Sequence, residues 1–188
     1  MWLIPRVRRK KMQFDRDKFK VLVHYIIWKV GKRDRFGATK LNKVLWFTDA
    51  RAFVLTGKPI TGATYIREKW GPVPKQMMPI RAEMEREGLI RIINSRGDYD
   101  HTKFTTLTAP DLSLLTEFEK ETVNYWIKHI DENHTAASIS EQSHDFGWEI
   151  AAMGEELPLH AFLAARIRDL TPAELGKVRA RAKELGLG

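Results

Sequence analysis

The chain has 188 residues and no cysteine, and its 32 basic and 24 acidic side chains give a formal net charge of +8. This length fits one domain, or one domain with appended ends, since domains usually run about 100–200 residues. The missing cysteines exclude a disulfide framework, a thiolate metal site and a cysteine nucleophile. No apolar stretch approaches the ~18 residues that cross a bilayer, so we expect a soluble, cytoplasmic protein without a membrane partner.

The charge is distributed unevenly. Residues 1–110 carry 24 basic and 10 acidic side chains, a net +14, whereas residues 111–160 carry 2 basic and 11 acidic side chains, a net −9. The basic half could face nucleic acid or an acidic partner. Equally, the acidic segment could cover part of the basic half within the fold, and the sequence leaves both possibilities open.

The chain opens with a basic arm over residues 1–14. As a hypothesis, Arg8, Arg9 and Lys10 contact a partner or a polyphosphate. A solvated, frayed terminus is the plainer alternative. Apolar residues at helical spacing then predict a helix over residues 15–30 that ends at Gly31.

The stretch from Thr39 to Pro74 organises the rest of the chain. Its apolar residues recur at helical spacing, which predicts a buried helix over 39–56 with Thr39 as its cap and Gly57 at its end. Alternation then predicts a short strand over residues 61–68. The two prolines of Gly71-Pro72-Val73-Pro74 are expected to end that strand in a sharp turn.

A helix and a hairpin are predicted next. The helix covers residues 76–87, is interrupted early by Pro79 and stops at Gly88. Two β-rich runs around a glycine turn predict an antiparallel hairpin over residues 89–107. Helices followed by such a hairpin indicate a winged-helix-like arrangement. We therefore predict an α+β, mostly helical fold: a compact helical domain with a small winged-helix-like β-hairpin.

The acidic half contains further helix signals. Thr116 and Glu119 form a capping box that opens a helix through Ile130, and Thr135 can cap a shorter helix that leads to a loop over 146–148. A threonine followed by a proline predicts a basic terminal helix within residues 171–188. The expected units are thus the arm over 1–14, a domain over 15–170 and the terminal helix.

The residue patterns argue against catalysis. Ser143, His144 and Asp145 are adjacent, so their side chains point in different directions and cannot share the hydrogen bonds of a catalytic triad. His129 and His134 are five apart, whereas two metal ligands on one helical face are three or four apart. The glycines are too dispersed to cradle a phosphate. We expect no catalytic residue, no metal and no cofactor, and hence no enzyme.

DNA binding is a second function to weigh. Phosphate contacts could come from basic residues of the buried helix and of the hairpin, namely Lys40, Lys43, Arg51, Arg91, Arg96 and Lys103. The helix over 39–56, however, carries mostly apolar and aromatic side chains, which leaves few polar groups to read base edges. We therefore expect the basic half to contact a protein partner rather than to read a DNA sequence.

Several motifs, in their order and spacing, resemble the Panacea (SocA-like) antitoxin family. The motifs are Thr39-Lys40-Leu41-Asn42-Lys43-Val44-Leu45-Trp46-Phe47, Gly57-Lys58-Pro59-Ile60, Tyr65, Trp70-Gly71-Pro72-Val73-Pro74 and Ser140-x-x-Ser143-His144-x-x-x-Trp148. The family pattern is a Lys-Leu-x-Lys-Leu-Leu-Tyr-Phe helix, a Tyr-Gly-Pro-Val segment and a late Ser-His…Trp motif. The resemblance spans roughly residues 18–165, with conservative departures at Val44, Trp46 and Trp70.

The resemblance implies a non-enzymatic antitoxin of a type II toxin–antitoxin system that neutralises a cognate protein toxin by direct contact. It also implies that the protein could deliver the toxin to a protease. A winged-helix-like DNA-binding transcriptional regulator is the alternative, and the oligomeric state is left open.

The same resemblance assigns the motif core or partner site to Lys40, Asn42, Lys43, Trp46, Tyr65, Trp70, Ser143, His144 and Trp148. We expect the three tryptophans of this set to pack together or line a groove. Ser143 and His144 are expected to fix a turn by hydrogen bonds. Part of the partner contact is expected from the basic arm and wing, that is Arg8, Arg9, Lys10, Arg91, Arg96 and Lys103.

Overall fold

The computed structural model describes residues 13–31, 33, 35–95, 101–160, 162 and 176. Arg8, Arg9 and Lys10 of the arm, Arg96 of the wing and all but residue 176 of the predicted helix within 171–188 lie outside the described residues.

Two helices form the centre of the fold. α1 (Arg16–Val30) and α2 (Ala38–Thr56) match the predicted ranges to within one residue. The side chain of Asp15 caps α1 by accepting the Lys18 N–H at 2.9 Å. The prediction of Thr39 as the cap of α2 is wrong: α2 begins after Gly37, which offers no side chain to cap it. Gly57 ends α2 in the left-handed conformation, as expected.

A small sheet lies against α2. β1 (Tyr65–Glu68) pairs antiparallel with β2 (Gly71–Pro74) on one side and with β5 (Glu156–Leu157) on the other, so β2 is an edge strand. The prediction that the prolines end strand structure is therefore wrong. Pro72 and Pro74 are two residues apart, so their nitrogens face the same side of β2, and an edge strand has one side on which no N–H is needed.

The predicted hairpin is confirmed. β3 (Ile90–Ser95) and β4 (His101–Thr106) pair antiparallel, with Ile90 opposite Thr106. α3 (Met77–Arg86) precedes it and packs on α1 and β3. Pro79 does not interrupt α3, because it stands at the third helical position, where an N–H would have no partner within the helix.

Three helices complete the described fold. α4 (Glu117–Asn133) begins at the predicted capping box and packs on α2, where Trp126 stacks on Phe47 with ring centroids 4.6 Å apart. α5 (Ala136–Gln142) is capped by Thr135, as predicted. Residues 146–148, predicted as a loop, belong instead to the short helix α6 (Phe146–Ile150), which Asp145 caps by accepting the Trp148 N–H at 3.0 Å.

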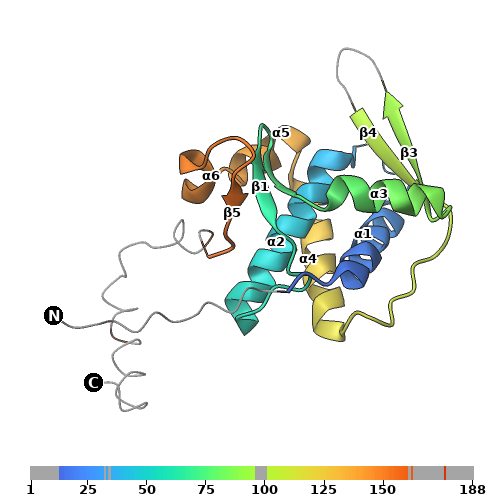
Figure 1. Ribbon diagram of the computed structural model, residues 1–188, viewed down its shortest axis with the longest axis horizontal. Helices are drawn as coiled ribbons and strands as arrows, with labels where there is room; N and C mark the ends of the chain where they lie inside the picture. The colour runs from blue at the N-terminus through green and yellow to red at the C-terminus, as the bar shows by residue number, and fades with distance from the viewer. Residues whose placement is uncertain are drawn as a thin grey trace.

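The described chain is thus α+β and mostly helical, as predicted (Figure 1). The acidic segment does cover part of the basic half: Lys18 of α1 pairs with Glu119 of α4 at 2.9 Å, and Arg33 pairs with Asp131. Among the described helices, none is long and apolar enough to cross a bilayer.

Candidate functional site

The first family-like motif is built into the core. α2 buries Lys40, Leu41 and the whole run from Lys43 to Ala50, and its exposed residues are Arg51 and those from Val54 to Thr56. Trp46 is 1% exposed and meets the ring of Tyr65 edge-on, with centroids 4.9 Å apart. Trp46 is therefore a packing residue. α2 also presents no polar face that could enter a DNA groove, which argues against base reading by this helix.

Asp49 is a buried hydrogen-bonding centre that the sequence reading missed. Its carboxylate accepts the backbone N–H groups of Ile60 and Thr61 at 2.8 and 3.0 Å, the Thr61 hydroxyl at 2.6 Å and the Tyr65 hydroxyl at 2.9 Å. Burial raises the pKa of Asp49, and these four donors oppose that rise. A carboxylate among the buried apolar positions of a helix was the signal that could have revealed it. Through these hydrogen bonds Asp49 attaches to α2 the segment that leads into β1.

Lys43 joins α2 to the edge strand β2. Its side chain is 1% exposed, and its ammonium donates to the Pro72 carbonyl oxygen at 3.1 Å. Gly71, next to Pro72, has φ +92, and a Cβ there would lie 2.6 Å from the Lys43 Nζ and 2.3 Å from the Ser143 Oγ. The Ser143 hydroxyl is buried and donates to the Ser140 carbonyl oxygen at 2.6 Å. Lys43, Gly71 and Ser143 thus bring three separate sequence motifs into one tight junction.

Trp148 fastens α6 to the β1–β2 hairpin. Its indole N–H donates to the Glu68 carbonyl oxygen at 3.1 Å, and the Arg67 guanidinium lies 4.3 Å from the indole ring. The His144 imidazole stacks on the same indole, with centroids 3.6 Å apart and planes 6° from parallel. Burial, and then the charges of Lys43 and Arg67, lower the pKa of His144, so its neutral form is favoured near pH 7.

His144 is held by stacking. Its Nε2 is buried without a hydrogen-bond partner among the described residues, so the expectation that this side chain fixes a turn by hydrogen bonding is not met. Within the described part of the chain, no group of three or more His, Asp or Glu side chains could hold a metal ion.

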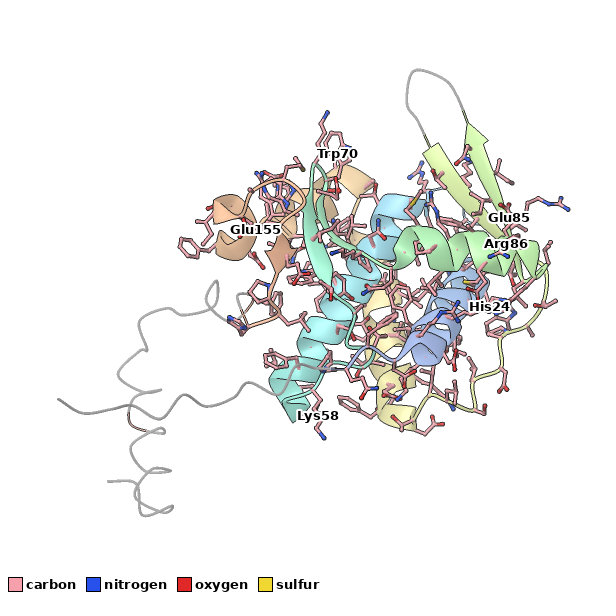
Figure 2. The ribbon with its side chains drawn as sticks, in the orientation of Figure 1. His24, Lys58, Trp70, Glu85, Arg86 and Glu155 are labelled. Carbon is pink, nitrogen blue, oxygen red and sulfur yellow. The ribbon has the colours of Figure 1, made fainter. Side chains whose placement is uncertain are left out.

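The three motif tryptophans do not pack together. Trp46 is in the core and Trp148 is half-buried on α6, whereas Trp70 lies at the tip of the β1–β2 hairpin, 59% exposed. Figure 2 shows Trp70 projecting from that tip. The Lys69 ammonium lies 4.9 Å from its ring. The expected grouping is wrong because Trp70 lies in the turn between β1 and β2, away from the buried Trp46.

Further exposed apolar side chains lie on and next to α6, which Trp148 connects to the hairpin by a hydrogen bond. They are Phe146 and Ile150 of α6, 57% and 69% exposed, and Met153 just beyond it, 58% exposed. We call Trp70, Phe146, Ile150 and Met153 the hairpin–α6 surface. A contiguous patch of exposed apolar side chains is typical of a contact surface for a partner, whereas single exposed apolar residues are common on any protein.

The remaining predicted residues are dispersed. Asn42 is half-buried, and its Oδ1 has no partner among the described residues. Lys40 is buried beside a pocket at the N-terminal end of α5. Of the wing residues, Arg91 is exposed on β3 and Lys103 is half-buried on β4. The structure therefore brings together Lys43, Ser143, His144 and Trp148 around the β1–β2 hairpin and leaves the wing apart from them.

Lys43 makes stability depend on pH. Burial lowers the pKa of Lys43 from 10.5 to about 7, so between pH 7 and 10.5 the unfolded chain holds a proton that the folded chain has released. Stability should therefore rise with pH in this window, by at most about 1.4 kcal/mol per pH unit. Urea unfolding at pH 7, 8 and 9 measures the slope.

Lys43→Met should remove most of that slope. Lys40, whose pKa burial also lowers, contributes a part that survives this substitution. A slope equal to that of the wild type would mean that the Lys43 ammonium stays solvated in the folded protein.

In this site, buried and half-buried polar side chains attach the β1–β2 hairpin to α2 and α6. The family described as antitoxin SocA-like, Panacea domain, matches residues 41–149, which is more than half of the chain. The chain belongs to this family. Comparison with curated proteins and with solved structures gave no match.

Proposed function

We propose that the protein is the antitoxin of a type II toxin–antitoxin system and that it neutralises its cognate toxin by direct protein contact. Membership of the antitoxin family supports a toxin partner in general. The observation that carries the direct-contact mechanism is Trp70, an exposed tryptophan on a hairpin that buried hydrogen bonds hold rigid.

A tryptophan presented in this way suits a binding anchor. Aromatic side chains supply much of the binding energy of protein interfaces, because they bury a large apolar area and have few rotatable bonds. The junction of Lys43, Gly71 and Ser143 orders the hairpin before any partner arrives, so little conformational entropy is lost on binding. The apolar residues of α6 would extend the contact around the Trp70 anchor.

The basic arm and wing are proposed as the outer part of this contact. Arg91 is exposed, and charges at the rim of an interface mainly accelerate the encounter of the partners. A positively charged rim would suit a toxin with an acidic surface. Delivery of the bound toxin to a protease would be a later step that this contact permits.

Trp70→Ala tests the proposal. With the toxin encoded in the adjoining reading frame, the wild-type protein should rescue growth on co-expression and bind the toxin directly. Loss of the anchor should weaken binding by about 2–4 kcal/mol, or ~30- to 1000-fold in Kd, and reduce rescue. Titration calorimetry with the purified toxin measures the change.

Trp28→Ala is the matched control. Trp28 is also exposed, at 43%, but lies on α1 and stacks on Tyr25, away from the hairpin. Toxin binding should be unchanged in this variant. Equal losses of toxin affinity from both substitutions would show that the contact does not lie on the hairpin–α6 surface. Binding to random duplex DNA instead of the toxin would favour the alternative, a DNA-binding transcriptional regulator.

A further inference from the structure

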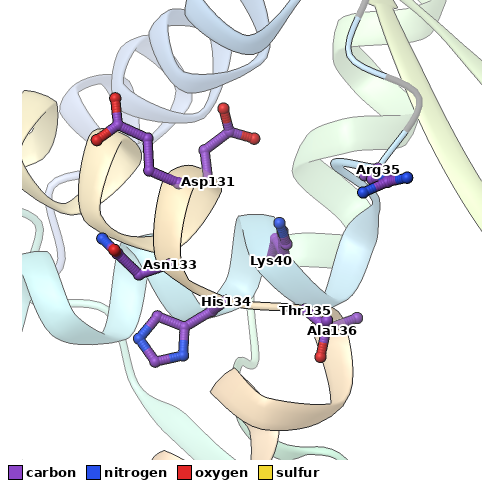
Figure 3. Close-up of a pocket in the computed structure, with 8 residues that line it drawn as sticks. Arg35, Lys40, Asp131, Asn133, His134, Thr135 and Ala136 are labelled. Carbon is purple, nitrogen blue, oxygen red and sulfur yellow. The ribbon is translucent and has the colours of Figure 1, made fainter.

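A pocket of about 540 Å³ lies at the junction of α2, α4 and α5 (Figure 3). Arg35 lines it from the loop before α2, Lys40 from the first turn of α2, and residues 131–136 from the end of α4 and the turn into α5. This volume lies within the range of about 300–1,000 Å³ that is typical of small-molecule sites. None of the residues of the hairpin–α6 surface lines it.

Lys40 is the unusual residue of this pocket. It is only 3% exposed, yet its ammonium has no hydrogen bond or ion pair among the described residues. The contact that the structure gives it is with the Phe36 ring, whose centroid is 5.9 Å away. A buried charge without a counterion is unfavourable, because it loses water and gains no compensating partner. The pocket thus holds a cation that has no direct ion-pair partner among the described residues.

Asp131 supplies an opposite charge at longer range: it favours the protonated form of Lys40 but makes no direct ion pair with it. Asp131, a carboxylate of the pocket, pairs with Arg33, and Glu132 is exposed. Arg35 makes no ion pair with a described residue, and its charge acts against the protonated form of Lys40. The positive charge of Lys40 likewise lowers the pKa of His134, after burial and His129. Lys40 is therefore close enough to both Arg35 and His134 for its charge to interact with theirs.

We propose that this pocket binds a small molecule through a phosphate group, with Lys40 as the inner contact and Arg35 as the outer one. Two unpaired cations match a phosphate, which carries a charge of about −1.5 to −2, better than they match a single carboxylate. The pocket is larger than one phosphate, so a diphosphate or a phosphate ester fills it better than the free ion. This site is separate from toxin neutralisation and does not depend on it.

Pyrophosphate is the first probe. It should raise the Tm of the full-length wild-type protein and bind measurably by calorimetry, whereas sodium chloride at equal ionic strength should not. Succinate, a dicarboxylate with a similar charge, should bind at least ~10-fold more weakly, since charge-assisted hydrogen bonds to phosphate are strong and specific in geometry. Equal effects of succinate and pyrophosphate would overturn the assignment to phosphate.

Lys40→Met should reduce the affinity for pyrophosphate by at least ~10-fold, because a charged hydrogen bond is lost. The variant should still fold, and without ligand its Tm should be no lower than that of the wild type, since an unpaired buried charge has gone. Arg35→Gln should weaken binding less, because Arg35 is exposed.

Lys58→Met is the control for charge alone. Lys58 is an exposed lysine two residues beyond the end of α2 (Figure 2), and the helix alone separates Lys40 from Thr56 by about 24 Å at ~1.5 Å per residue. This variant should bind pyrophosphate as the wild type does. A response to pyrophosphate that Lys40→Met leaves intact, or that Lys58→Met removes equally, would overturn the proposal.

Discussion

Gly71→Ala is expected to lower the free energy of unfolding by about 2–4 kcal/mol, one of the largest effects of a single methyl group in this protein. Gly71 has φ +92, which is strained for any residue with a Cβ, and the added Cβ would lie 2.3 Å from the Ser143 Oγ and 2.6 Å from the Lys43 Nζ. Both atoms belong to buried side chains, so neither can move into solvent. Urea unfolding followed by circular dichroism measures the loss.

Gly88→Ala separates backbone strain from crowding. Gly88 also has a positive φ, +70, but a Cβ there meets nothing within 4 Å, so this variant should lose only about 1 kcal/mol. Adding Ser143→Ala to Gly71→Ala should recover part of the larger loss, because it removes the nearest clashing atom. If the two glycine variants lose equal stability, the junction is looser than the structure indicates.

The helices were predictable because their signals are local. The stripe of α1, the capping box at Thr116 and the glycine after α2 depend on residues within one or two turns of each other. The hairpin over β3 and β4 was predictable for the same reason, since two β-rich runs flank one short turn.

The errors arise where a residue's environment depends on distant segments. Two prolines argue against a strand unless the strand lies at a sheet edge, and β2 is an edge strand because β1 alone pairs with it among the described strands, while β5 takes the other side of β1. Lys43 suggests a DNA or partner contact in the sequence, but the carbonyl that receives its ammonium belongs to Pro72. Neither relationship is visible from neighbouring residues.

The candidate site shows the same division. The family-like motifs identified the residues that meet around the hairpin, but they did not distinguish the buried Trp46 from the exposed Trp70. An aromatic residue in a glycine- and proline-rich turn is equally consistent with a corner packed on the core. The pairing of β1 with β2 places Trp70 in the turn between them, where its side chain faces solvent.

Asp49→Ala is expected to lower the free energy of unfolding by about 3–5 kcal/mol, since it leaves several buried donors without an acceptor. The donors are the N–H groups of Ile60 and Thr61 and the hydroxyls of Thr61 and Tyr65. The backbone N–H groups cannot reorient, so their hydrogen bonds are lost without replacement. The loss should appear in urea unfolding as a lower midpoint.

Two further variants divide the loss into charge and hydrogen bonding. Asp49→Asn keeps the shape and one acceptor oxygen, so it should lose less than Asp49→Ala, while Tyr65→Phe removes one donor and should lose only about 1 kcal/mol. Combined with Asp49→Ala, Tyr65→Phe should cost less than it does alone, because its hydroxyl has already lost its acceptor. Fully additive losses would mean that the Tyr65 hydroxyl and the Asp49 carboxylate contribute to stability independently of each other.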